Sequence, residues 1–129
     1  MMPNLLLDTC ALIWLAEGSD CLSKNAYRCI DDAFVVYVSP ISLWELARKV
    51  AKGVLKLPLE PIEWFDRAKE QHNLTVLPLS ESAAFKAATL PEIHKDPSDR
   101  FIVASAMENN LVIVTADRII PQYGVECIC

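Results

Sequence analysis

Residues 111–117, Leu-Val-Ile-Val-Thr-Ala-Asp, form a short apolar run that ends on an acidic residue. The β-branched side chains of this run predict a buried strand, with Asp117 just beyond its carboxyl end. Residues 5–8, Leu-Leu-Leu-Asp, repeat the pattern near the start of the chain, with Asp8 in the corresponding place. Strands that are apolar on both faces are typical of a parallel sheet that helices cover on both sides.

Helix and strand patterns alternate along the chain, which indicates an α/β fold of three layers, α/β/α, with a mostly parallel sheet of four to five strands. We expect strands at residues 5–7, 34–38, 74–77, 111–115 and 125–128. We expect helices at residues 9–17, 23–32, 40–52, 61–71, 81–90 and 97–110. The length of 129 residues suits a single domain, residues 1–129.

The first of these helices, residues 9–17, is apolar nearly all round. One apolar face would suffice for packing on a sheet, so the second face needs a further explanation. Two explanations stay open: an interface with a second copy or another protein, and deeper burial within the monomer.

Composition limits the classes of function. The net charge is −5, so bulk electrostatics would not hold nucleic acid, and any RNA contact must be local and metal-assisted. No apolar run reaches the roughly 18–20 residues that span a membrane, and the first four residues lack the basic start of a signal peptide, so we expect a cytoplasmic protein. The five cysteines form no CxxC pair, and we expect free thiols at Cys10, Cys21, Cys29, Cys127 and Cys129.

Four acidic residues lie where a predicted strand ends or a predicted helix begins: Asp8, Glu45, Asp99 and Asp117. The carboxyl ends of parallel strands share one edge of the sheet, and ligands bind there. Four carboxylates at one edge repel each other unless a cation joins them, which points to Mg²⁺ or Mn²⁺ and to chemistry on phosphate. Each acid alone also has an ordinary role as a helix cap, a turn residue or half of a surface ion pair.

Four short motifs occur in order along the whole chain. They are Leu-Leu-Asp-Thr at 6–9, Ser-Leu-Trp-Glu-Leu at 42–46, His-Lys-Asp-Pro-Ser-Asp-Arg at 94–100 and Val-Thr-Ala-Asp at 114–117. Through these motifs the chain resembles the PIN domain, and within it the VapC-type toxin ribonucleases of bacterial toxin–antitoxin pairs. The resemblance implies a PIN-like fold that hydrolyses phosphodiester bonds of single-stranded RNA with one or two Mg²⁺ or Mn²⁺ ions. It also implies an antitoxin partner and a homodimer.

The resemblance implies metal-binding or catalytic roles for the same four acids. Asp96 is expected to cap its helix or to act as an accessory acid. Thr115 is expected to support the fourth acid, and Thr9 lies beside the first. Ser98 departs from the family pattern, in which an apolar residue is frequent at this position.

Six basic residues lie near these acids in the sequence and are candidates for contacts with RNA phosphates, or for ordinary surface charge. They are Arg48, Lys49, Lys52, Lys95, Arg100 and Arg118. No alternation of aromatic and basic residues marks a base-reading surface, so the sequence does not define the RNA target.

Two other functions fit part of the pattern. An enzyme with an aspartyl nucleophile at Asp8 would need a second acid two residues later, where Cys10 stands. A catalytically silent PIN-like scaffold would keep the fold and bind only a protein partner. Stabilisation by Mn²⁺ that is lost in Asp99→Asn would distinguish the nuclease from the scaffold.

Overall fold

The computed structural model describes residues 3–129. Within this range the strands are β1 (Leu5–Leu7), β2 (Val36–Val38), β3 (Leu74–Val76), β4 (Val112–Val114) and β5 (Cys127–Ile128). The helices are α1 (Thr9–Glu17), α2 (Lys24–Asp32), α3 (Pro40–Ala51), α4 (Pro61–His72), α5 (Glu81–Thr89), α6 (Pro97–Asn109) and a 3₁₀ helix, η1 (Ile120–Tyr123). Every element expected from the sequence is present, and η1 is an addition that no sequence pattern predicts.

All five described strands run parallel, in the order β3-β2-β1-β4-β5. The expectation of a mostly parallel sheet of four to five strands is therefore confirmed. β1 lies at the centre, between β2 and β4. Its three leucines, Leu5, Leu6 and Leu7, are completely buried because both faces of the sheet are covered. Leu5 and Leu7 belong to one hydrophobic cluster and Leu6 to the other, as the alternation of a strand requires.

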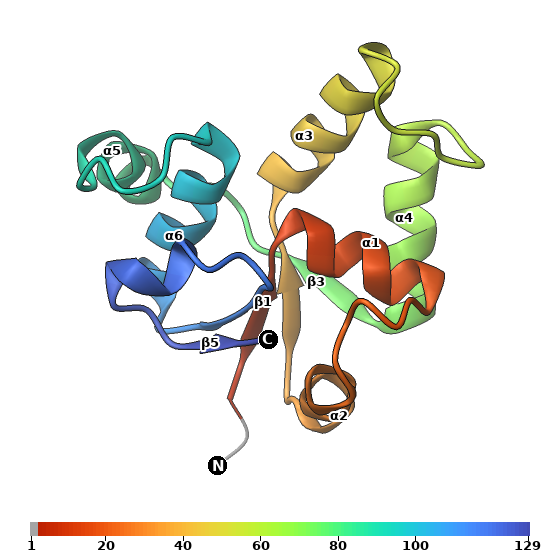
Figure 1. Ribbon diagram of the computed structural model, residues 1–129, viewed down its shortest axis with the longest axis horizontal. Coiled ribbons are helices and arrows are strands. Elements are labelled where there is room, and N and C mark those ends of the chain that lie inside the picture. The colour runs from red at the N-terminus through yellow and green to blue at the C-terminus, as the bar shows by residue number, and fades with distance from the viewer. Residues whose placement is uncertain (1–2) are drawn as a thin grey trace.

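The helices form a layer on each face of the sheet (Figure 1). α1, α2 and α4 cover the face to which Leu5 and Leu7 point, and α5 and α6 cover the face to which Leu6 points. α3 stands over one end of the strands and reaches both layers, since Leu46 belongs to the first cluster and Ile41 packs against the second. The predicted α/β/α architecture is confirmed.

Polar N-caps fix where most helices begin. Ser23, Ser39 and Ser80 cap α2, α3 and α5, while Asp8 caps α1 and Asp96 caps α6. In each case the side-chain oxygen accepts a hydrogen bond from a backbone N–H of the first turn, which satisfies a donor that the helix itself leaves free. The starts of α1, α3 and α6 thereby meet at the carboxyl edge of the sheet.

The second apolar face of α1 is covered within the monomer. Only Cys10 and Glu17 of this helix are exposed. Partly buried leucines from the segment between α3 and α4, at positions 55, 57 and 59, pack against the cluster that contains α1. Deeper burial therefore accounts for the apolar sequence of α1, and the homodimer stays a prediction.

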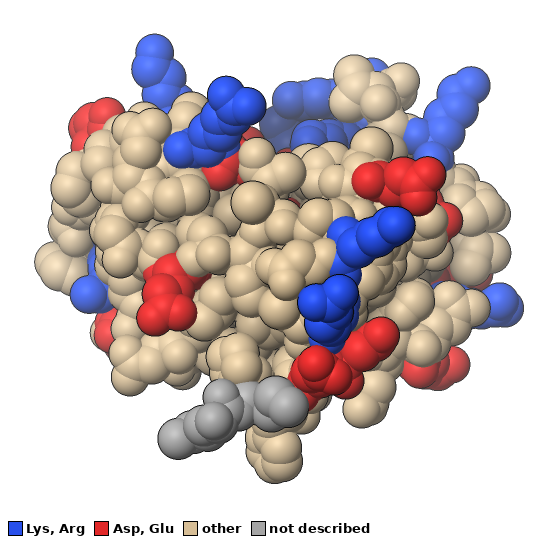
Figure 2. Space-filling view, turned by 60° about the horizontal axis from the view of Figure 1, so that its bottom comes forward, with Lys and Arg blue, Asp and Glu red and all other residues tan. Residues whose placement is uncertain are grey.

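Charges on the face drawn in Figure 2 are mixed, with lysine and arginine side chains interspersed among aspartate and glutamate over a largely uncharged surface. No helix within residues 3–129 is long and apolar enough to cross a membrane. The five cysteines are all free of disulfide bonds in the structure.

Candidate active site

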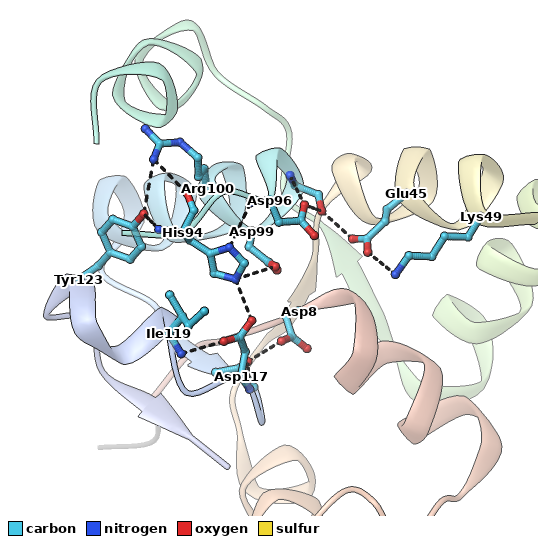
Figure 3. A network of polar contacts seen from close by, with 12 residues as sticks. Asp8, Glu45, Lys49, His94, Asp96, Asp99, Arg100, Asp117, Ile119 and Tyr123 are labelled. Atoms are coloured by element: carbon cyan, nitrogen blue, oxygen red, sulfur yellow. Dashed lines mark hydrogen bonds and ion pairs between the residues drawn. The ribbon is translucent and has the colours of Figure 1, made fainter. Parts of the chain in front are cut away.

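A cavity of about 370 Å³ opens at the carboxyl edge of the sheet, where β1 and β4 end and α3 and α6 approach. All four acids singled out in the sequence line it: Asp8, Glu45, Asp99 and Asp117. Figure 3 shows their carboxylates converging from four separate elements. The remaining lining residues are Thr9, Cys10, Trp14, Lys49, His94, Asp96 and Ala116.

Asp8 lies at the junction of β1 and α1, and 4% of its surface is exposed. Its Oδ1 accepts a hydrogen bond of 2.8 Å from the backbone N–H of Ala11, which is the helix cap. Its Oδ2 accepts a bond of 2.5 Å from the hydroxyl of Thr115. Burial raises the pKa of Asp8, and these two hydrogen bonds offset only part of that effect. The residue is both a structural cap and a member of the acidic site.

Thr115 joins two of the acids. Its hydroxyl donates to Asp8 and accepts a bond of 3.0 Å from the backbone N–H of Asp117. The hydroxyl of Thr9 lies 2.9 Å from that of Ser42, which ties the start of α1 to α3. Thr9 lines the cavity while Thr115 does not, and the hydrogen bonds of both connect the elements that carry the acids.

Asp99 and Asp117 face each other across the imidazole of His94. The His94 Nε2 lies 2.8 Å from Asp117 Oδ2 and 3.2 Å from Asp99 Oδ2. Burial and the neighbouring charge of Asp96 raise the pKa of Asp99 to about 7, although His94 partly offsets them. Burial also raises the pKa of Asp117, but hydrogen bonds from His94 and the backbone N–H of Ile119 outweigh it and hold that pKa below its usual value.

Glu45 is held at both oxygens. Its Oε1 accepts a bond of 2.7 Å from the hydroxyl of Ser98, and its Oε2 lies 2.7 Å from the ammonium of Lys49. The Ser98 hydroxyl also lies 2.8 Å from Asp96 Oδ1, and Ser98 is completely buried. A serine in place of an apolar residue is explained here, because its hydroxyl is shared between two carboxylates. The hydrogen bond with Glu45 raises the pKa of Lys49, which stays charged.

Asp96 takes the position of helix cap expected from the sequence. Its Oδ1 accepts a bond of 3.0 Å from the backbone N–H of Ser98. The same side chain also lines the cavity beside the four acids.

The basic residues singled out in the sequence divide into two groups. Lys49 lines the cavity, whereas Arg48, Lys52, Lys95 and Arg118 are exposed and do not line it. The guanidinium of Arg48 lies over the ring of Trp44, 5.5 Å from its centroid. These five side chains are accessible to a bound polyanion.

Arg100 does not suit the phosphate contact expected from the sequence. Its guanidinium donates to the backbone carbonyls of Ala87, Leu90, Pro91 and His94. The residue is buried, and its donors are used to hold the segment between α5 and α6 against α6. The structure gives Arg100 a structural role instead.

His94 and Tyr123 belong to the site but were not among the residues expected from the sequence. The backbone N–H of His94 donates to the hydroxyl of Tyr123 at 2.7 Å, and this hydroxyl donates to the carbonyl of Pro91 at 3.0 Å. His94 lies within the third motif, but no other His or Cys stands at a metal-ligand spacing from it, so its place beside two carboxylates could not be seen. Tyr123 lies in η1, which no pattern predicts.

The donors around the cavity suit a hard divalent cation. The nearest candidate ligand atoms of His94, Asp99 and Asp117 lie within 4.8 Å of one another. Carboxylate oxygens are the ligands that Mg²⁺ and Mn²⁺ prefer. Burial first, and the charges of neighbouring carboxylates second, raise the pKa values of Asp8 and Asp99. A bound cation would favour the ionised form of both groups. Although the Cys10 residue is exposed, partial desolvation of its thiol at the cavity and the charge of Asp8 raise the thiol pKa to about 11, so the thiol is protonated at neutral pH.

The parallel sheet with acids at its carboxyl edge places the chain in the class of α/β proteins whose site is a cluster of carboxylates. The sequence model of the PIN domain matches residues 5–126, and the chain belongs to this family. The chain is 30% identical to Ribonuclease VapC22 of Mycobacterium tuberculosis over 118 residues, which cover 91% of this chain and 89% of that protein.

Solved structures of low sequence identity share the fold. One is VapBC2 from Rickettsia felis bound to a DNA fragment from its promoter, with a TM-score of 0.72, 17% identity and 97% of each chain covered. Another is a toxin–antitoxin complex from Klebsiella pneumoniae, with a TM-score of 0.61, 20% identity, and 88% of this chain and 86% of that chain covered.

Proposed function

We propose that this protein is a metal-dependent endoribonuclease that hydrolyses phosphodiester bonds of single-stranded RNA and serves as the toxin of a toxin–antitoxin pair. The observation that carries the proposal is the convergence of Asp8, Glu45, Asp99 and Asp117 on one cavity. Membership of the PIN domain family and the likeness to a ribonuclease over nearly the whole chain support it.

Asp8, Asp99 and Asp117 are the residues we expect to hold one or two Mg²⁺ or Mn²⁺ ions, directly or through water. A bound ion would supply charge to polarise the scissile phosphate and to lower the pKa of a water molecule. Asp8 and Asp117 are fixed by backbone and threonine hydrogen bonds, so they need little rearrangement. Preorganised ligands of this kind cost little entropy on binding.

Glu45 has a separate task in this proposal. Its carboxylate is clamped between the Ser98 hydroxyl and the Lys49 ammonium at the wall of the cavity. From there it can complete the acidic cluster or orient the attacking water. Lys49 can in turn contact a phosphate, and the exposed Arg48, Lys52 and Lys95 are further candidates for contacts with the RNA backbone. Arg118, exposed after β4, is another such candidate.

An antitoxin partner is the second part of the proposal. Large apolar side chains are exposed on α3, on the segment after it and on α4, with 49% of Trp44, 71% of Val54 and 55% of Ile62 accessible. Large apolar side chains exposed in this way are candidates for a protein interaction surface. Inhibition of RNA cleavage by a protein encoded beside this one would test the partner, and light scattering of the pure protein would test the homodimer.

The decisive experiment is cleavage of a mixed pool of cellular RNA by purified protein in Mg²⁺, Mn²⁺ or EDTA. Wild type and Asp20→Asn, a change of an exposed turn residue, should cut only when metal is present. Asp99→Asn should not cut under any condition. Equal cutting by all three proteins would indicate a contaminating nuclease. Absence of cutting by wild type, with bound antitoxin excluded, would favour the catalytically silent scaffold.

A further inference from the structure

His94 is buried in the acidic site yet has no part in the function proposed above. It precedes α6 and is held at its backbone from two sides. Its N–H donates to the Tyr123 hydroxyl at 2.7 Å, and its carbonyl accepts from the Arg100 guanidinium at 3.3 Å. Figure 3 shows the imidazole projecting from this anchor toward Asp99 and Asp117. The question is what the imidazole of His94 contributes to the two carboxylates that it contacts.

The hydrogen bonds of the ring determine where its proton lies. Nδ1 lies 3.1 Å from the backbone nitrogen of Asp96, whose N–H can only donate, so Nδ1 must be the acceptor. In the neutral ring the proton then sits on Nε2, the atom that faces Asp117 Oδ2 at 2.8 Å and Asp99 Oδ2 at 3.2 Å. A nitrogen that carries a proton cannot coordinate a metal. His94 is therefore a donor to the carboxylates and not a ligand beside them.

We propose that His94 is a positioning residue whose Nε2–H holds the carboxylates of Asp99 and Asp117 side by side for metal binding. The inference rests on the proposed metal site but needs no assumption about RNA. Each carboxylate oxygen has two lone pairs, so one bond from His94 leaves both residues able to bind a cation. The second oxygen of Asp117 is fixed by the backbone N–H of Ile119 at 2.7 Å.

The physical benefit is preorganisation. Two like charges that share one donor can lie close together before the cation arrives, whereas without the donor their repulsion disfavours this arrangement. Hydrogen bonds that orient metal-binding carboxylates contribute to affinity, and their loss typically lowers metal affinity about 10–100-fold. The anchoring of His94 by Arg100 and Tyr123 extends this support to α6 and η1.

The test is calorimetric titration with Mn²⁺ of wild type, His94→Ala, His94→Gln and His72→Gln. His94→Ala should bind Mn²⁺ at least about tenfold more weakly. His94→Gln should recover most of the affinity, because the glutamine amide can place an N–H near the position of Nε2. His72→Gln changes the other histidine, at the end of α4, and should leave the affinity unchanged.

A nitrogen-detected NMR spectrum of the wild-type imidazoles shows which ring nitrogen of His94 carries the proton. Because it uses the wild-type protein, this test does not depend on whether a variant folds. The proposal requires His94 to carry its proton on Nε2, with Nδ1 bare, both before and after Mg²⁺ is added. Wild-type affinity in His94→Ala, or a proton on Nδ1, would overturn the role of His94 while leaving the metal site intact. A wild-type protein that binds no Mn²⁺ would overturn the proposed metal site together with this inference. Binding that depends on His94 in a protein that cuts no RNA would support the inference and contradict the nuclease.

Discussion

Replacement of Asp99 by asparagine should stabilise the metal-free protein at alkaline pH while it removes metal binding. Asp99 lies in the first turn of α6, with 16% of its side chain exposed. Burial and the charge of Asp96 raise its pKa from the usual 3.8 to about 7. An ionised carboxylate here is therefore unfavourable unless a cation joins it, and the neutral amide of asparagine avoids that cost.

The sign of the effect follows from proton linkage. The folded protein holds the Asp99 proton more tightly than the unfolded chain, so this group favours folding most below pH 3.8. The contribution is lost as the pH rises through about 7. The difference between these values corresponds to at most about 4 kcal/mol at about 1.4 kcal/mol per pH unit. We expect Asp99→Asn to recover about 2 kcal/mol at pH 8, since the amide must still be buried beside the other carboxylates.

The assay is urea unfolding of wild type, Asp99→Asn and Asp20→Asn in EDTA at pH 5 and at pH 8. For a chain of this size the expected gain at pH 8 is equivalent to about 6–10 °C in Tm. The gain should shrink at pH 5, where wild-type Asp99 is protonated. Saturating Mn²⁺ should stabilise wild type and Asp20→Asn at pH 8 and leave Asp99→Asn unchanged. An Asp99→Asn protein that is no more stable than wild type in EDTA at pH 8 would refute the reasoning.

Two further substitutions separate residues that support the site from residues that support the fold. Ser98→Ala should slow RNA cleavage about tenfold, because Glu45 loses the donor that fixes its Oε1, and should lower the unfolding free energy by about 1 kcal/mol. The control is Ser105→Ala, which removes a buried hydroxyl of the same helix. This hydroxyl has no hydrogen-bond partner in the described chain, so cleavage should be unchanged. Arg100→Lys should lower the unfolding free energy by about 2–3 kcal/mol, because it leaves buried carbonyls without donors, whereas Arg28→Lys on the exposed side of α2 should be neutral. Weaker RNA binding by Arg100→Lys without loss of stability would restore the phosphate contact first expected for it.

The elements that could be predicted from the sequence are those whose cause is local. Leu5, Leu6 and Leu7 identify a central strand because a strand buried on both faces has no polar position. Serine and aspartate mark helix starts because their side chains satisfy free backbone donors within three residues. The four acids could be placed at one edge because the carboxyl ends of parallel strands share it.

The features that could not be predicted depend on partners far away in the chain. His94 is oriented by Tyr123, which is 29 residues away, and Ser98 donates to Glu45 across 53 residues. Arg100 stands next to a site acid in sequence, but its side chain points to the carbonyls that end α5. Sequence proximity to an acid was the only signal for the phosphate contact, and it does not determine which way a side chain points.

The order of the strands determines when the acidic cluster can exist during synthesis. β1 is made first, yet its neighbours in the sheet are β2 and β4, and the Thr115 hydroxyl that fixes Asp8 comes 107 residues later. A nascent chain that still lacks β4 therefore contains Asp8, but it lacks the strand that pairs with β1 on one side and the Thr115 hydroxyl that donates to Asp8. Contacts between such distant parts of a chain form late in folding. The complete acidic site can therefore form only after nearly the whole chain has been translated.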